Sequence, residues 1–175
     1  YAAGSKKMTP QVHQFIARHK NLLTGRVLEI GSFNVNGSVR DVIDVAVGVD
    51  IRPGKGVDLV CQVEDLPKHF SPCEFDACVS TETLEHVKDW RAFFGVTWDM
   101  VKPGGWLVMS MASMNKGRHD YPDDYWRFDL DRIAEIYPVL EFCGPIGRPN
   151  KPVSIGWVAQ KAGILGPMDF EPYTV

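Results

Sequence analysis

Several features that mark other protein classes are missing from this chain of 175 residues. None of its four cysteines forms a CxxC pair, whereas a zinc site built on cysteines needs two close ligand pairs. No apolar run reaches the ~18 residues of a membrane-spanning helix. No long basic run marks a nucleic-acid surface, and the net charge is −3. We therefore expect reduced cysteines in a cytoplasmic protein that binds neither a membrane nor a nucleic acid.

The composition that is present is that of a globular domain. Hydrophobic residues make up 45% of the chain and charged residues 23%, which excludes a disordered or collagen-like chain. No repeat or long linker divides the sequence, and its length suits one domain. We expect a single domain over residues 1–175, with an N-terminal helix in 1–25, a cofactor-binding half in 26–111 and a substrate-side half in 112–175.

Short apolar runs alternate with helical stretches along the chain. Helices are expected from Pro10 with Thr9 as N-cap, from 89 to about 101, and over 130–137 with Asp129 as N-cap. Strands are expected at 26–30, 44–51, 57–61, 75–80 and 106–111, and a closing pair at about 139–143 and 154–160, joined by a loop rich in glycine and proline. This order predicts an α/β fold, namely a Rossmann-like, doubly wound, mostly parallel seven-stranded sheet with an antiparallel C-terminal edge strand.

Polar side chains follow four of these strands where they end, in 29–34, 50–51, 62–67 and 80–82. In an open parallel sheet, ligands bind beyond the carboxyl ends of the strands, so these segments predict one site. Gly31 lets the backbone approach a ligand closely. Asp50 can accept hydrogen bonds from both hydroxyls of a ribose, or else it caps the turn before Pro53.

The turn after the first strand lacks the GxGxxG pattern of a dinucleotide site. Phe33 stands where the second glycine would be, and the next glycine is Gly37. A nicotinamide-dependent oxidoreductase is therefore disfavoured.

Five blocks of sequence, taken together, resemble the class I S-adenosylmethionine (SAM)-dependent methyltransferases, and most closely the small type 11 kind. The blocks are VLEIGS…NGS, GVDI, VEDLP, FDACVSTETLEHV and VKPGGWLVMS, within residues 26–143. Their order and spacing all agree with the family, which is far more specific than any one block. The resemblance implies SAM as the cofactor and transfer of its methyl group to an O or N of a small molecule.

The resemblance also implies roles for individual residues. Glu29 matches the acidic residue that orients the glycine loop and the cofactor's amino group, and Gly31 the glycine under its methionine part. Asp50 matches the acid that binds the ribose, and Ile51 the apolar neighbour of adenine. The full set of expected cofactor contacts is Glu29, Gly31, Ser32, Phe33, Asn34, Asp50, Ile51, Gln62, Val63, Glu64, Ser80 and Thr81.

Two residues depart from the family pattern. Phe33 replaces a glycine, and Gln62 replaces an acidic residue, although its carbonyl oxygen still accepts a hydrogen bond from the adenine amino group. These departures keep open an alternative function, a methyltransferase-like binding or scaffold protein without turnover.

Residues 117–128, GRHDYPDDYWRF, are dense in aromatic and charged side chains. They are similar to an H…YWRF segment found in a subset of these methyltransferases. We expect Tyr121, Tyr125 and Arg127 to bind substrate, because such a loop makes a good substrate wall and an arginine grips carboxylates or phosphates. The alternative is a structural loop in which Arg127 pairs with an aspartate. Neighbouring aspartates usually cap turns, so no metal is expected.

A hydroxyl or protonated amine acceptor must lose a proton during methyl transfer. His86, His119 and Glu82 are the candidate bases, since histidine titrates near neutral pH. For His86 a structural role between its short helix and the core is equally open. Methyltransferases with the H…YWRF segment look similar to ones that act in sugar or polysaccharide pathways, which favours such a metabolite as the acceptor. The sequence does not indicate an oligomeric state.

Overall fold

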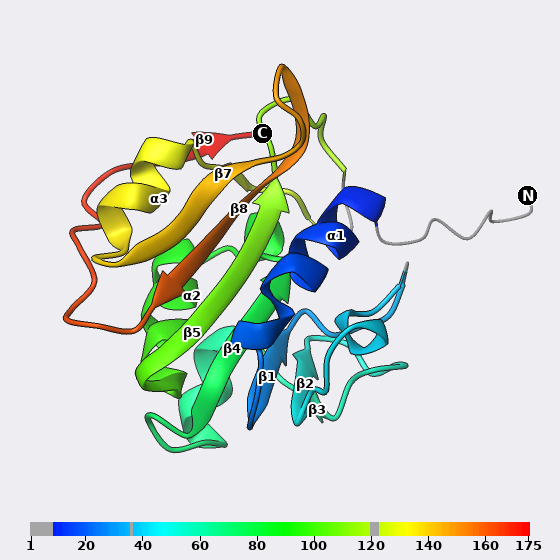
Figure 1. Ribbon diagram of the computed structural model, residues 1–175, viewed down its shortest axis with the longest axis vertical. Coiled ribbons are helices and arrows are strands. Elements are labelled where there is room, and N and C mark those ends of the chain that lie inside the picture. The colour runs from blue at the N-terminus through cyan, green and yellow to red at the C-terminus, as the bar shows by residue number, and fades with distance from the viewer. Residues whose placement is uncertain (1–8, 36, 120–122) are drawn as a thin grey trace, which may run out of the picture.

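The computed structural model describes residues 9–35, 37–119 and 123–175. At its centre is a seven-stranded sheet in the order β3-β2-β1-β4-β5-β8-β7 (Figure 1). Strands β1 to β5 run parallel, β8 runs antiparallel to β5, and β7 closes the edge antiparallel to β8. The α/β class and the mostly parallel sheet with an antiparallel C-terminal edge are thus confirmed. The strands are β1 (Val27–Ile30), β2 (Val47–Asp50), β3 (Leu59–Val60), β4 (Phe75–Thr81), β5 (Val101–Ala112), β7 (Leu140–Arg148) and β8 (Lys151–Gln160).

Helices cover both faces of this sheet (Figure 1). Helix α1 (Pro10–His19), continued by the 3₁₀ turn η1 (Lys20–Leu22), buries Val12, Phe15 and Ile16 against one face. Helices α2 (Trp90–Met100) and α3 (Leu130–Ile136) bury their apolar sides against the other face. Double coverage explains why β1 is buried along its whole length and reads as an apolar run. Among the described residues no helix has the length and apolar character needed to cross a membrane.

All three helices start where the sequence predicts, and two of the three N-cap side chains make the expected hydrogen bond. Asp89 caps α2 by accepting a hydrogen bond from the Ala92 N–H at 3.0 Å, and Asp129 caps α3 through the Arg132 N–H at 2.8 Å. Thr9 occupies the N-cap of α1, but its side chain makes no capping hydrogen bond. Thr9 is therefore the N-cap residue, as expected, but without a side-chain bond, and Pro10 at the first helical position, with its fixed φ, favours the start of this helix.

The closing hairpin is longer than the sequence indicates. The stretch expected as a loop continues both strands, and Arg148 still pairs with Lys151 next to a two-residue turn. Pro145 is tolerated because β7 is an edge strand, where a missing N–H leaves no ladder bond unmade. A register shift between Ile146 and Gly147 absorbs the irregularity, with Gly147 at a φ of 106°. The expected glycine- and proline-rich loop is therefore replaced by strand.

The last fifteen residues form a strap that the sequence did not predict. Arg91 of α2 donates hydrogen bonds to the carbonyls of Met168 and Phe170 at 2.9 and 2.8 Å, and the Phe170 ring stacks on Trp90 with ring centres 5.1 Å apart. The strap ends in β9 (Tyr173–Thr174), which pairs with β6 (Trp126–Arg127) as a separate two-stranded sheet. The C-terminus thereby fixes the YWRF segment from outside.

Candidate active site

The strand registers bring the segments with polar side chains to one edge of the sheet. Ile30 at the end of β1 lies opposite Val49 of β2 and Ser80 of β4, and Thr81 lies opposite Ser110 of β5. The segments that follow are the turn 31–34, residues 50–51, and the 3₁₀ turns η3 (Val63–Lys68) and η4 (Leu84–His86). This is where an open parallel sheet binds its ligand.

The turn after β1 is tightly enclosed. The N–H groups of Gly31 and Ser32 both donate to the carbonyl of Val49, at 2.9 and 3.0 Å. Gly31 has a φ of 79°, and a Cβ at this position would lie 2.0 Å from Oγ1 of Thr83. Only glycine suits both the backbone conformation and the space, as the sequence predicted.

Asp50 presents a fixed carboxylate at the end of β2. Its Oδ2 accepts the Phe33 N–H and its Oδ1 accepts the Arg52 N–H, both at 3.1 Å. Each oxygen keeps a further lone pair, so the carboxylate can still accept two ligand hydroxyls. Ile51 beside it is 50% exposed, an open apolar surface of the kind that a flat base covers. Asp50 therefore both holds the turn and offers the acceptor pair that a ribose needs.

Glu29 is a buried carboxylate with an unfilled acceptor. Its side chain is 5% exposed, the Arg40 guanidinium lies 3.8 Å away, and Oε2 has no hydrogen-bond partner among the described residues. Burial raises the pKa of Glu29 to about 7; Arg40 opposes this rise, and the charges of Asp58 and Asp50 add to it. An orphaned buried carboxylate of this kind suits a cationic group, and the amino group of SAM is one, so the site fits the cofactor.

Both departures from the family pattern are accommodated. The Phe33 ring lies against Gly54, where an added Cβ would meet ring carbon Cε2 at 2.1 Å, and the Arg52 guanidinium sits 5.5 Å from the ring centre. Gln62 is exposed at the N-cap of η3 and makes no capping hydrogen bond. Asn34 closes its own turn through the Gly37 N–H at 3.0 Å.

The other expected cofactor contacts differ in how far they reach the surface. The Ser80 hydroxyl donates to the Ile30 carbonyl at 2.9 Å, so it ties β4 to β1 and points away from solvent. Ser32 and Val63 are also buried, whereas Glu64 and Thr81 are half-buried.

Glu82, one of the three candidate bases, directly follows β4 on the side of the site where the methyl acceptor is expected. Its backbone takes a left-handed φ of 52°, its Oε2 accepts Lys116 Nζ at 2.9 Å, and its Oε1 accepts the Ser110 hydroxyl at 3.3 Å. Burial and the nearby charge of Glu85 raise the pKa of Glu82, while Lys116 opposes this rise. Glu82 is therefore tethered on both oxygens.

His86 and His119 come together although they lie far apart in the sequence. Their rings meet edge to face with centres 5.0 Å apart, and His86 Nδ1 bonds the carbonyl of Asp123. His119 Nδ1 lies 3.0 Å from Oδ2 of Asp124, and its Nε2 lies 3.7 Å from Oε1 of Glu85. The interaction with Glu85 raises the pKa of His119, against the effect of burial. Sequence reasoning missed Glu85, whose only signal is its place beside His86 in the LEHV block.

Arg127 is placed as the structural alternative described. Its side chain is 3% exposed and grips the fully buried carboxylate of Asp124, with Nη2 2.8 Å from Oδ2. Burial alone would raise the pKa of Asp124, but hydrogen bonds from Arg127 and from the His119 N–H lower it to about 2. Phe128 lies in the core. Arg127 therefore positions His119 through Asp124 and is not presented to a ligand.

The two tyrosines expected to bind substrate have different outcomes. Tyr125 is half-buried and its hydroxyl donates to Asp123 at 3.0 Å. Tyr121 lies outside the described residues.

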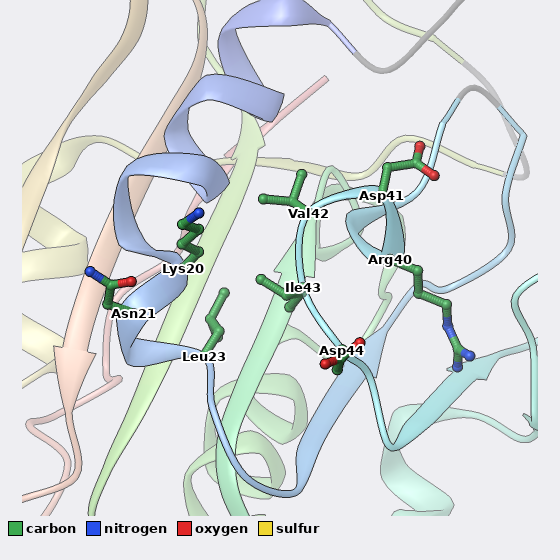
Figure 2. Close-up of a pocket in the computed structure, with 8 residues that line it drawn as sticks. All are labelled: Lys20, Asn21, Leu23, Arg40, Asp41, Val42, Ile43 and Asp44. Carbon is green, nitrogen blue, oxygen red and sulfur yellow. The ribbon is translucent and has the colours of Figure 1, made fainter.

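A hollow of about 350 Å³ lies elsewhere, between the segment that follows α1 and residues 40–44 (Figure 2). It shares only Arg40 with the surroundings of Glu29, and that side chain extends away from the hollow. The hollow is therefore separate from the site at the strand ends. It is lined by Lys20, Asn21, Leu23, Arg40, Asp41, Val42, Ile43 and Asp44.

Comparison with known proteins identifies the family of this chain. A family model of type 11, described as a methyltransferase domain, matches residues 40–109. A ubiquinone biosynthesis O-methyltransferase of Chromobacterium violaceum is 30% identical over 191 aligned positions, which cover 96% of this chain and 78% of that protein.

Two solved structures share the fold. A SAM-dependent methyltransferase from Archaeoglobus fulgidus superposes with a TM-score of 0.62 at 13% identity, covering 86% of this chain and 93% of the other. The 1,6-didemethyltoxoflavin-N1-methyltransferase of Burkholderia thailandensis, solved with 1,6-didemethyltoxoflavin and S-adenosylhomocysteine, gives 0.63 at 13% identity, covering 88% and 79%.

The fold and the strand-end site define a class I SAM-dependent methyltransferase. Within that class the chain belongs to the type 11 family. It is an enzyme, and SAM is its cofactor.

Proposed function

We propose that this enzyme methylates a hydroxyl oxygen of a small molecule, with His119 as the proton acceptor. The observation that carries the proposal is the hydrogen-bonding position of His119. Its Nδ1 faces the Asp124 carboxylate at 3.0 Å, which holds the proton on Nδ1 and leaves a lone pair on Nε2. The relative from Chromobacterium violaceum, an O-methyltransferase, supports oxygen over nitrogen.

The cofactor half of the proposal rests on the residues at the ends of β1 and β2. Asp50 accepts the two ribose hydroxyls, Ile51 covers the adenine ring, and Gln62 accepts from the adenine amino group. The Glu29 carboxylate pairs with the cationic amino group of SAM. Gly31 leaves the backbone close enough for the methionine part to pass over it. When bound, SAM supplies an electrophilic methyl group on a sulfonium.

The chemical step needs alignment and the removal of one proton. The acceptor oxygen forms the new C–O bond as the C–S bond breaks and its electron pair goes to sulfur. The hydroxyl proton passes to His119 Nε2. Holding the reacting atoms in line supplies much of the rate, and the base contributes roughly a further 10²–10⁴-fold.

The polar character of the acceptor side supports a hydroxyl-rich substrate. His86 packs against His119, Lys116 donates to Glu82, and Tyr125 donates to Asp123. Such a lining suits a sugar or a polysaccharide-pathway metabolite, and it disfavours a nucleic acid. The four cysteines are unpaired, which supports a cytoplasmic location. The placement of Glu29, Gly31 and Asp50 supports turnover over the scaffold alternative.

The test is a methyl-transfer assay with radiolabelled SAM and a panel of sugars, polyols and phenols. We expect transfer to oxygen, and we expect His119→Gln to lower kcat by roughly 10²–10⁴-fold while S-adenosylhomocysteine affinity stays the same. His69→Ala, at an exposed position away from the site, is the matched control. A His119→Gln enzyme with unchanged kcat would remove the base from the proposal.

A further inference from the structure

Glu85, His86 and His119 each offer one ligand atom, and these three atoms lie within 4.8 Å of one another. We propose that they bind a single divalent transition-metal ion, and Zn²⁺ is the ion with which the proposal is tested. Two imidazole nitrogens and one carboxylate oxygen form a ligand set that such ions accept, with a further position open to water or a substrate oxygen. The inference rests on the proposed function only for the acceptor, since ion binding needs no turnover.

The separation of His119 from Glu85 is the first argument. Nε2 of His119 and Oε1 of Glu85 are 3.7 Å apart, which is too far for a hydrogen bond. Two ligands of one tetrahedral ion at about 2.0–2.1 Å stand about 3.3–3.4 Å apart. The observed separation therefore suits two ligands of one ion better than a direct bond.

The outer partners of the two histidines are the second argument. His119 Nδ1 faces Asp124 Oδ2 at 3.0 Å, and His86 Nδ1 bonds the backbone carbonyl of Asp123. In metal sites, a ligating histidine almost always gives its other ring N–H to a carboxylate or a carbonyl, which fixes the ring and its tautomer. Both rings thus have this support in place at Nδ1, so Nε2 is the ring nitrogen that each would offer to an ion.

The burial of Glu85 is the third argument. Its side chain is 0% exposed, Oε1 accepts only the Ala112 N–H at 3.1 Å among backbone donors, and Oε2 has no hydrogen-bond partner within the described part of the chain. Lys116 is bound to Glu82. A buried carboxylate is costly without a counter-charge. The hydrogen bond from the Ala112 N–H gives only Oε1 a partner and supplies no charge. A bound cation would supply that counter-charge.

The ion would change how the acceptor loses its proton. It would lie beside the end of β4, where an acceptor hydroxyl can take the open coordination position. Coordination lowers the pKa of a bound hydroxyl, so the proton leaves to solvent before the oxygen attacks the methyl carbon. In the metal-loaded enzyme His119 is then a ligand, and the ion takes over the role that free Nε2 has without it.

The experiment is a calorimetric titration of Zn²⁺ into the untagged, chelator-treated chain. We expect one ion per chain and at least about a 100-fold loss of affinity in His119→Ala. His69→Ala and Cys73→Ser, which alter other zinc-binding side chains, should leave the affinity unchanged. No saturable binding to the wild-type chain, or equal binding to His119→Ala, would overturn the inference.

A second readout guards against misfolding of the variants. Thermal unfolding without metal should give similar Tm values for wild type and His86→Asn, while excess Zn²⁺ should raise the Tm of wild type alone. An equal rise in His86→Asn would also count against the site.

Methyl transfer in EDTA then separates this inference from the proposed function. A wild-type chain that methylates a hydroxyl in EDTA but binds no zinc refutes the ion and keeps the function. A chain that binds zinc at these residues and methylates no hydroxyl keeps the ion and refutes the function.

Discussion

The two halves of the strand-end site are held in place by different parts of the chain. In the cofactor half, the Asp50 carboxylate is fixed by backbone N–H groups of Phe33 and Arg52, which lie next to the strand ends. In the acceptor half, Glu82 is held by the side chains of Lys116 and Ser110. Glu85 accepts the Ala112 N–H, and His119, from the loop that follows β5, lies 3.7 Å from it. Cofactor geometry therefore follows from the sheet, whereas acceptor geometry requires a separate loop to dock correctly.

The largest expected effect is on the docking of that loop. Arg127→Ala should lower the free energy of unfolding by about 3–5 kcal/mol, because it removes the guanidinium that pairs with the fully buried Asp124 carboxylate. Arg132→Ala removes an arginine with the same three-residue spacing from its partner, but that pair is exposed to solvent, so its loss should cost far less than the loss of the buried pair. Urea unfolding of both variants checks the difference. Similar losses would mean that burial of the first pair does not matter.

The turn at Gly31 should be the next most sensitive. Gly31→Ala forces a side chain into a left-handed backbone and against Thr83, and should cost about 2–3 kcal/mol of stability. Gly95→Ala, within α2 with nothing within 4 Å of the new Cβ, should be neutral or stabilising by up to about 1 kcal/mol. Thermal unfolding compares them. A tolerated Gly31→Ala would show that the turn can open.

Glu29 should make stability depend on pH. Its pKa is about 7 in the folded chain against 4.5 for the free side chain, so the folded state holds the proton more tightly. This contribution is fully present below pH 4.5 and is lost as the pH rises through 7. As the pH rises from 4.5 to 7, the free energy of unfolding of Glu29→Gln should therefore increase by roughly 2 kcal/mol relative to that of the wild type.

Urea unfolding of the wild type and of Glu29→Gln at pH 4.5 and at pH 7, without cofactor, measures this difference. Glu135→Gln, at an exposed carboxylate, is the control and should show no such trend. A constant difference between Glu29→Gln and wild type would contradict the raised pKa.

The smallest expected effect is on the pH profile of methyl transfer. His119 must be unprotonated to act as a base, and Glu85 raises its pKa above 6.5. In metal-free buffer, kcat/KM should rise with pH with a midpoint above 6.5, and Glu85→Gln should move that midpoint down. A midpoint unmoved by Glu85→Gln would assign the titration to another group.

The sequence predicted the backbone around the ends of β1 and β2 far better than the packing around His119. Strand ends, the turn at Gly31 and the position of Asp50 all follow from local pattern, because parallel strands bring their ends together whatever surrounds them. The role of Glu85 and the burial of Arg127 depend on contacts across β5 and on the C-terminal strap. Such contacts between distant segments produce no periodic pattern in the sequence. The neighbours of Arg127 in the sequence therefore could not distinguish a substrate ligand from a buried partner of Asp124.

The most direct test of two separately built half-sites is a calorimetric titration of S-adenosylhomocysteine into Asp50→Ala and His119→Ala. Asp50→Ala should weaken binding by about 1.5–3 kcal/mol, because a carboxylate bonded to two hydroxyls is lost. His119→Ala should bind as the wild type does, and so should the control Asp44→Ala. Equal losses in Asp50→Ala and His119→Ala, or none in either, would contradict the division of the site.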